Sequence, residues 1–210
     1  MISIDDQPIS ATFFGEGRWL TDFVTPDALE VRELYQKLTQ NISQGEDEIS
    51  ACWDWVANQV RYKQFIKAKI WVEGKSSVQN DFWQTPSMII KTHVGNCANK
   101  AFALCSLLRN LVSPDEVHVV LGNLTSDGVG GHAWCTMKFS NREYIIEATR
   151  DDVCPVLATD AEIYEPVVYF NDKDVNVIRG KTLKEPLGYC CVGWLKDYLD
   201  MRRCDEFVVR

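Results

Sequence analysis

Hydrophobic positions in the first half of the chain recur at helical spacing. Leucines follow this spacing in residues 27–40, and five apolar residues in residues 46–62 fall at i, i+3, i+4, i+7 and i+11. Acidic residues occupy the first turn of the second segment, where the helix dipole favours them. A proline opens a third, short predicted helix over residues 86–93. Residues 63–85 mix polar and aromatic side chains, so we expect that segment to be irregular.

The pattern changes in the second half of the chain. Residues 97–111 are apolar nearly all the way round, which predicts a buried central helix. Residues 116–122 are rich in β-branched side chains and predict a strand. Two further strands are expected over residues 132–139 and 142–149, joined at Ser140-Asn141 by a tight hairpin turn.

Short apolar runs complete the predicted elements. Residues 167–170 and 175–178 predict further strands, and residues 194–207 predict a C-terminal helix. Helices precede an antiparallel sheet, which is the order of an α+β fold. No repeat or Pro/Gly-rich linker divides the chain, so we expect one domain over residues 1–210.

Composition narrows the class of protein. Apolar residues make up 46% and charged residues 25%, as in globular proteins, and the formal net charge is −8. A surface this acidic argues against nucleic acid as a partner. No segment is long and apolar enough to span a membrane, and the first ten residues lack the features of a secretory signal. The eight cysteines form no CxxC pair, so we expect no structural zinc, mostly reduced thiols and a cytoplasmic protein.

One cysteine stands where a nucleophile is favoured. Cys97 follows the Gly95-Asn96 break and is the first residue of the predicted buried helix. The unpaired amides and the dipole at a helix N-terminus stabilise a thiolate, and they also stabilise the oxyanion that forms when a thiolate attacks a carbonyl. A cysteine at a helix end is more often a small buried core residue, so Cys97 needs partners to count as catalytic.

The predicted hairpin supplies two such partners. If Ser140-Asn141 is a two-residue loop, facing residues sum to 281, and Glu147 becomes the diagonal neighbour of His132 on the same face, about 7–8 Å away between backbones. A register summing to 279 would place the two directly opposite, whereas an even sum would separate them. A carboxylate among apolar strand residues is costly unless it is paired, which favours a His132–Glu147 pair.

Three blocks resemble the transglutaminase-like superfamily. They are VGNCANKAFALCSLLRNL, GGHAWCTMKF and EYIIEAT, and the stretch NDFWQTPSMIIKTHVGNC resembles the run-up in bacterial transglutaminase-like cysteine proteinases. The resemblance covers residues 47–150, with extensions on both sides. It implies a papain-like core in which the catalytic helix packs on an antiparallel sheet. The chain departs from the family in having Asn96 before the cysteine and Glu147 as the acidic third member, where Asp is usual.

The resemblance also implies an activity and its residues. It makes Cys97 the nucleophile, His132 the base and Glu147 the group that orients the imidazole. A side-chain donor should complete the oxyanion hole, with Trp83 and Gln84 as candidates and Trp83 preferred. Asn96 and Trp134 are expected to line the same cleft.

Several functions remain open at this point. A peptidase or amidase that acts through a thioester on peptides or proteins is the first choice. Transglutaminase activity, acyltransferase activity and a non-catalytic interaction module on the same fold are the alternatives. No cofactor or metal is expected, and the sequence does not indicate an oligomeric state. His93, His118, Cys105 and Cys135 are interpreted as structural.

Overall fold

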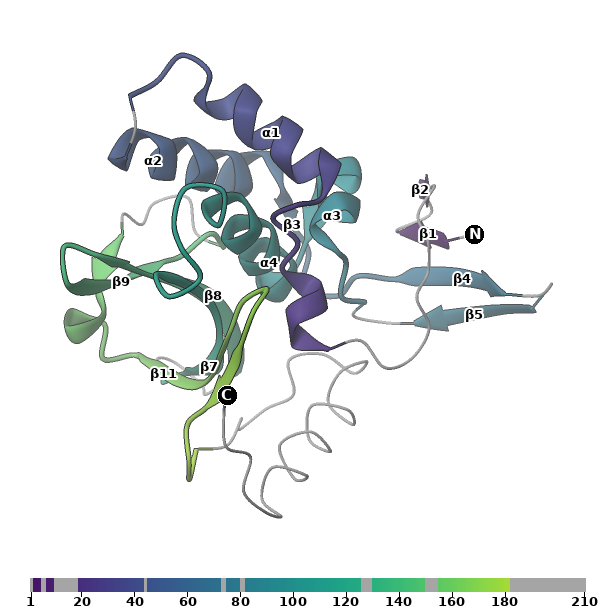
Figure 1. Ribbon diagram of the computed structural model, residues 1–210. Coiled ribbons are helices and arrows are strands. Elements are labelled where there is room, and N and C mark those ends of the chain that lie inside the picture. The colour runs from purple at the N-terminus through teal and green to yellow at the C-terminus, as the bar shows by residue number, and fades with distance from the viewer. Residues whose placement is uncertain are drawn as a thin grey trace.

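The elements follow one another as helices first and a large antiparallel sheet second (Figure 1). The computed structural model describes residues 2–4, 7–9, 19–43, 45–72, 75–79, 82–125, 130–149 and 155–181. The helices are η1 (Leu20–Phe23), α1 (Leu29–Thr39), α2 (Glu46–Asp54), η2 (Trp55–Gln59), α3 (Pro86–Thr92), α4 (Cys97–Leu108) and η3 (Ala158–Asp160). The predicted helix at residues 194–207 lies outside the described residues.

The strands form three sheets. A six-stranded antiparallel sheet has the order β10-β9-β8-β7-β11-β12. A four-stranded sheet has the order β2-β1-β4-β5, and β3 pairs with β6. Their bounds are β1 (Ile2–Ile4), β2 (Gln7–Ile9), β3 (Arg61–Tyr62), β4 (Ala68–Val72), β5 (Lys75–Gln79), β6 (Val94–Gly95), β7 (Val117–Leu124), β8 (Gly130–Phe139), β9 (Arg142–Ile146), β10 (Val156–Leu157), β11 (Tyr164–Phe170) and β12 (Val175–Val177).

Helix α4 is the centre of the fold, as its apolar sequence predicted. All twelve of its residues are buried, and it packs on β7 and β8. Its N-cap is Asn96, whose side chain accepts a hydrogen bond from the Asn99 amide at 3.0 Å. Burial of each large apolar side chain such as Phe102 or Leu104 stabilises this core by about 1.5–3 kcal/mol. The α+β architecture is thereby established, with α4 packed against one face of the larger sheet.

The β8–β9 hairpin has the expected register. Its two loop residues, Ser140 (φ 49°) and Asn141 (φ 62°), both adopt left-handed backbone conformations. This is the requirement of a type I′ turn, whose twist suits a two-residue hairpin. Phe139 faces Arg142 and Cys135 faces Ile146, so the pairs sum to 281 as predicted. This register places His132 of β8 and Glu147, the residue after β9, on the same face of the sheet.

Two sequence-based expectations were wrong. Residues 63–85 are not irregular, because β4 and β5 form a hairpin that projects from the rest of the fold (Figure 1). The pattern was masked by a small residue: Ile66, Ala68 and Ile70 are buried, with exposed lysines between them. The helix expected over residues 46–62 also stops early, since the α-helix ends at Asp54 and a π-helical turn, η2, leads into β3.

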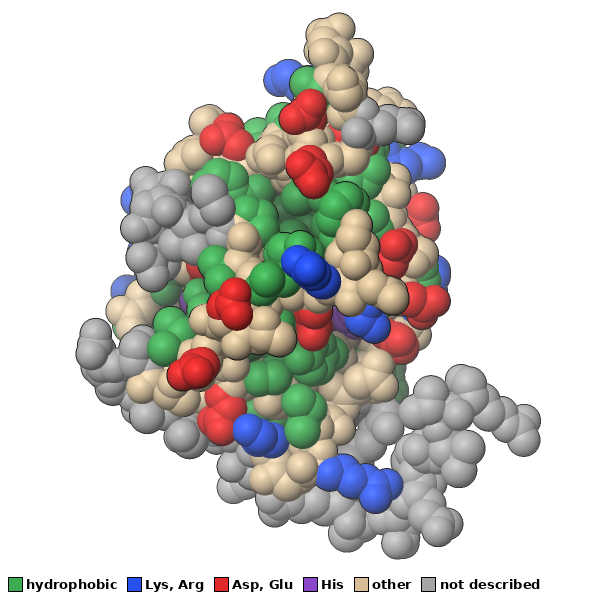
Figure 2. Space-filling view, turned by 90° about the vertical axis from the view of Figure 1, so that its left-hand side faces the viewer, with side chains coloured by type: hydrophobic (Ala, Val, Ile, Leu, Met, Phe, Trp, Pro, Cys, Tyr) green, Lys and Arg blue, Asp and Glu red, His purple; other side chains and the backbone are tan. Residues whose placement is uncertain are grey.

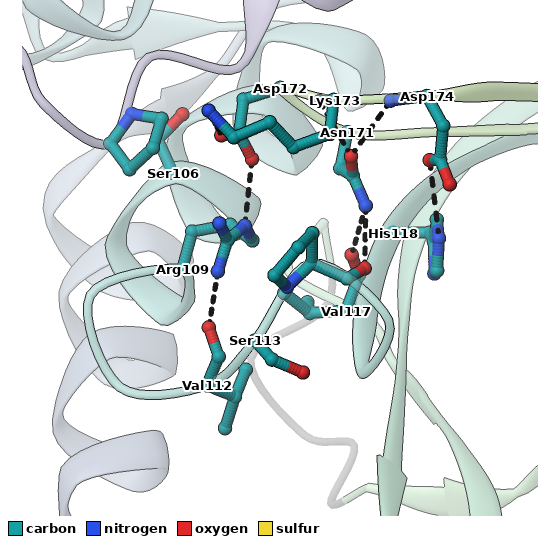
Figure 3. Close-up of polar contacts among 12 residues, drawn as sticks. Ser106, Arg109, Val112, Ser113, Val117, His118, Asn171, Asp172, Lys173 and Asp174 are labelled. Atoms are coloured by element: carbon teal, nitrogen blue, oxygen red, sulfur yellow. Dashed lines mark hydrogen bonds and ion pairs between the residues drawn. The ribbon is translucent and has the colours of Figure 1, made fainter. Parts of the chain in front are cut away.

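A polar cluster fixes the far end of α4 (Figure 3). Arg109 Nε donates to Asp172 Oδ1 at 2.7 Å, and both side chains are less than one-tenth exposed. Asn171 donates through its amide nitrogen to the carbonyls of Pro114 and Val117, at 2.6 and 3.2 Å. These bonds connect the end of α4 to β7 and to the turn after β11. The helix that begins with Cys97 is therefore anchored at its other end.

Candidate active site

The fold brings together the three residues that the sequence proposed. Cys97 is the first residue of α4, His132 lies near the start of β8, and Glu147 directly follows β9. His132 Nε2 and Glu147 Oε2 are 2.6 Å apart, and the Cys97 side chain hydrogen-bonds with the same imidazole. Since Nε2 is engaged by the carboxylate, Nδ1 is the nitrogen left for the sulfur. The order sulfur, imidazole, carboxylate is that of a nucleophile, a base and an orienting group.

The contacts between these residues shift the pKa values of His132 and Glu147 in opposite directions. Burial lowers the pKa of His132, but hydrogen bonds and charge interactions with Cys97 and Glu147 outweigh burial and raise it to about 10. Burial raises the pKa of Glu147, yet the hydrogen bonds from His132 and Thr149 bring it below its usual value. At neutral pH the site therefore holds an imidazolium beside a carboxylate. An imidazolium next to a sulfur favours the thiolate form.

The carboxylate of Glu147 is fully occupied by donors. Oε1 accepts from the Thr149 amide and from the Thr149 hydroxyl, both at 2.7 Å. Oε2 accepts from His132 at 2.6 Å and from the Tyr164 hydroxyl at 3.2 Å. Two donors on each oxygen compensate the cost of burying a charge that is only 2% exposed. The glutamate is thereby held in one orientation.

Two further residues hold the peptide that carries Glu147. Trp53 Nε1 donates to the Glu147 carbonyl at 2.6 Å. Lys100 Nζ, from α4, donates to the carbonyls of Ala148 and Ala57, each at 2.9 Å. Lys100 was not among the predicted site residues, although a lysine in an otherwise apolar helix is a visible signal in the sequence. Trp53 and Tyr164 were not predicted either, because their contacts with Glu147 come from elements distant in the sequence.

Aromatic rings surround the imidazole. Trp134 stacks on His132 with ring centroids 6.0 Å apart and planes at 24°, and Tyr164 meets Trp134 edge-on at 5.0 Å. Trp134 and His132 share a face of β8 as expected, while Cys135 packs in the core on the other face. Gly122 of β7, which faces His132 on the neighbouring strand β8, makes room for this arrangement. A Cβ there would lie 2.4 Å from the Trp134 ring and 2.3 Å from the Glu165 carbonyl oxygen.

The predicted cleft residues have distinct environments. Gln84 is fully buried, with its amide nitrogen donating to Val94 O and its amide oxygen accepting from Thr92. Asn96 is engaged as the N-cap of α4. Trp83 differs from both: it is 4% exposed, it packs against Phe102, and its indole nitrogen has no hydrogen-bond partner among the described residues. An unpaired buried donor is costly, which marks it as a group available to a ligand.

The structural interpretation of the other thiols and histidines agrees with their surroundings. Cys105 and Cys135 are buried free thiols, and burial is the main cause that raises the pKa of Cys135. His118 lies 3.6 Å from Asp174 in the polar cluster of Figure 3, and His93 Nδ1 donates to the Gln59 carbonyl oxygen. Within the described ranges no three His, Cys, Asp or Glu side chains form a group suited to a metal ion.

Charged side chains of both signs are dispersed over the face that carries α2 and β9 (Figure 2). Hydrophobic side chains gather between the charged ones near the centre of this face.

Across the described part of the chain, no helix is both long and apolar enough to cross a membrane.

Comparison with known proteins identifies the family. The model of the transglutaminase-like superfamily matches residues 32–146, more than half of the chain, so the chain belongs to that superfamily. The matched segment contains Cys97 and His132 and ends one residue before Glu147.

Individual relatives are more distant. UPF0252 protein MJ1282 of Methanocaldococcus jannaschii is 29% identical over 194 residues, which are 86% of this chain and 53% of that protein. The chain thus spans about half the length of this relative. The structure of Legionella pneumophila LapG is 15% identical over 88% of this chain and 99% of its own, with a TM-score of 0.48. A Cytophaga hutchinsonii protein proposed to be a cysteine protease is 18% identical over 75% and 52%, with a TM-score of 0.45. Neither structural likeness is close enough to indicate a shared activity.

Proposed function

We propose that this protein is a cysteine-dependent hydrolase that cleaves amide bonds in peptides or proteins. The observation that carries the proposal is the buried imidazole of His132, bonded to Glu147 on one side and to the Cys97 side chain on the other, with its pKa raised by both partners. A charged imidazole in contact with a thiol at a helix N-terminus is the arrangement that activates sulfur. Membership of the transglutaminase-like superfamily agrees with acyl-transfer chemistry of this kind.

Each step of the reaction has a residue to perform it. The Cys97 thiolate attacks the carbonyl carbon, a C–S bond forms, and the carbonyl oxygen takes the negative charge. His132 gives its Nδ1 proton to the leaving nitrogen, the C–N bond breaks, and a thioester remains. Water then attacks the thioester while Nδ1 takes its proton, the C–S bond breaks, and the acid leaves. Glu147 keeps the second ring nitrogen bonded throughout, so the imidazole exchanges protons only at Nδ1.

The oxyanion is assigned two donors. One is the backbone amide of Cys97, because the first amides of a helix have no partner within the helix. The other is the indole N–H of Trp83, which is buried and unpaired among the described residues. Gln84 fits this role less well, since its amide already bonds Val94 and Thr92.

Transfer to an amine or another acceptor is the second candidate, because the thioester is common to hydrolases, transglutaminases and acyltransferases. Hydrolysis is preferred since water reaches any open thioester, whereas transfer needs a second bound substrate. A non-catalytic interaction module would not need a charged imidazole supported by a carboxylate with four donors. That cost argues for catalysis.

The test is to trap the thioester. The wild-type protein is exposed to peptides, esters and acyl-CoA compounds, and the mass added at each cysteine is mapped. We expect an adduct at Cys97 from peptides or esters, and rapid alkylation of Cys97 by iodoacetamide. Cys52 is the internal control, because burial raises its pKa to about 12 and it should stay unmodified.

Two outcomes would change the proposed reaction, and a third would end the proposal. An adduct that forms only from acyl-CoA would support the acyltransferase, and product amides formed from added amines would support transglutamination. A purified Cys97→Ala protein with full activity would end the proposal of a cysteine enzyme.

A further inference from the structure

We propose that Tyr164 is a positioning residue of this site: its hydroxyl, bonded to Glu147, fixes how the carboxylate holds the imidazole of His132. The inference rests on the proposed function and deepens it. Its basis is that Tyr164 and His132 donate to the same oxygen, Oε2 of Glu147, at 3.2 and 2.6 Å.

Tyr164 reaches the site from a strand that does not neighbour the other two. It is the first residue of β11, which pairs with β7, whereas His132 and Glu147 belong to the β8–β9 hairpin on the other side of β7. The side chain therefore crosses β7. Gly122 of β7, which faces His132, leaves space for the ring of Trp134, and Tyr164 packs edge-on against that ring.

The ring of Tyr164 also limits the motion of the imidazole. Its centroid is 6.3 Å from that of His132 and 5.0 Å from that of Trp134, against which it packs edge-on. Trp134 in turn stacks on His132. The aromatic packing resists tilting of the imidazole, while the hydroxyl determines which carboxylate oxygen the imidazole meets and how much negative charge that oxygen offers.

The hydroxyl has a chemical consequence that packing alone does not have. An O–H donor spreads the negative charge of a carboxylate, so its removal leaves a more basic Glu147. A more basic carboxylate stabilises the imidazolium further and makes it a weaker proton donor to the leaving group. Loss of the hydroxyl should therefore raise the pKa of His132 above its value of about 10 and slow the acylation step.

The experiment compares Tyr164→Phe with Tyr169→Phe. Tyr169 lies on the same strand but packs against His118, so it is a matched control with the same atom removed away from the site. The His132 pKa is followed by NMR in proteins labelled at histidine, and kcat and KM are measured on a substrate found by thioester trapping. We expect Tyr164→Phe to raise the His132 pKa by about half a unit to one unit, and to lower kcat roughly tenfold with little change in KM, as for other groups that orient a histidine. Tyr169→Phe should change neither.

The NMR titration needs no substrate, so it separates the two proposals. If the protein hydrolyses nothing but the pKa of His132 moves in Tyr164→Phe alone, the positioning role stands and the hydrolase proposal fails. If Tyr164→Phe has the His132 pKa and kcat of the control, the positioning role is wrong whatever the activity.

If Tyr164→Phe fails to fold, a second measurement on the wild-type sequence tests the same inference. Replacing the tyrosines of the wild-type protein by 3-fluorotyrosine makes each hydroxyl a stronger donor, and this should lower the His132 pKa. An unchanged titration in the fluorinated protein overturns the inference.

Discussion

Replacing Glu147 by glutamine tests the charge of the site while keeping its shape. The carboxylate accepts from two donors on each oxygen, so an amide NH₂ group must face two donors whichever way it is placed. The hydroxyls of Thr149 and Tyr164 can rotate away, but the Thr149 amide cannot. The amide nitrogen should therefore face His132, which then must present an unprotonated Nε2 and carry its proton on Nδ1.

The size of the expected effect of Glu147→Gln follows from the raised pKa of His132. A rise from 6.5 to about 10 favours the imidazolium by about 5 kcal/mol, at about 1.36 kcal/mol per pKa unit. In Glu147→Gln this pKa should fall toward 6.5 or below, because burial still opposes the charge. The neutral imidazole holds the wrong tautomer to take a proton at Nδ1, and we expect kcat to fall roughly a thousandfold to ten-thousandfold.

Stability should respond with a defined sign. Because the folded pKa of His132 is raised, its stabilisation is fully present below about pH 6.5 and is lost as the pH rises through about 10. The pKa of Glu147 is lowered in the folded protein. The carboxylate therefore stabilises the fold at pH values above the ordinary pKa of a glutamate, and this stabilisation is lost as the pH falls through the lowered pKa. The difference in unfolding free energy between wild type and Glu147→Gln should therefore be large near pH 6 and shrink toward pH 10.

The assays are NMR titration of His132, steady-state kinetics and urea unfolding from pH 5 to 10. Glu143→Gln is the matched control, since it removes the same charge from β9 opposite Lys138, away from the imidazole. A wild-type His132 that titrates near pH 6.5, or a charged imidazole at pH 8 in Glu147→Gln, would show that Glu147 does not stabilise the imidazolium.

Two further substitutions test the framework of the site. Lys100→Met leaves the carbonyls of Ala57 and Ala148 without this donor, so urea unfolding should show a loss of about 2–4 kcal/mol, and kcat should fall because the Glu147 peptide shifts. Lys91→Met, which breaks an exposed ion pair with Glu30, should cost under about 1 kcal/mol, and equal losses would contradict the role of Lys100. Gly122→Ala places a methyl group 2.3 Å from backbone, and thermal unfolding should show destabilisation of about 1–3 kcal/mol or more, whereas an unchanged midpoint would contradict the close packing.

The sequence predicted those parts of the site that depend on local pattern. The uniform hydrophobicity of residues 97–111 identified a buried helix, and Ser140-Asn141 fixed the register that aligns His132 with Glu147. Neither inference required long-range information, because a helix start and a two-residue turn are set by neighbouring residues. The catalytic roles of Cys97, His132 and Glu147 remain predictions.

The parts that were missed depend on contacts between distant segments. Tyr164 meets Glu147 only because β11 pairs with β7, and Trp53 meets the Glu147 carbonyl only because α2 lies against the end of β9. The β4–β5 hairpin was missed for a different reason, since Ala68 gives a weak apolar signal at its buried position. In a single sequence, the periodicity of hydrophobic residues does not indicate which distant segments come into contact.

The polar cluster at the end of α4 affects how the sulfur and the imidazole can separate. Asp172 follows β11, so α4 and β11 are joined by Arg109–Asp172 at one end, while the row from Cys97 through Glu147 to Tyr164 joins them at the other. Because α4 and β11 are bonded to each other at both ends, they resist hinge-like opening: rotation about one set of contacts strains the other set. Separation of the Cys97 side chain from the His132 imidazole therefore requires the release of all the contacts at one end, and gradual bending should leave the two side chains bonded.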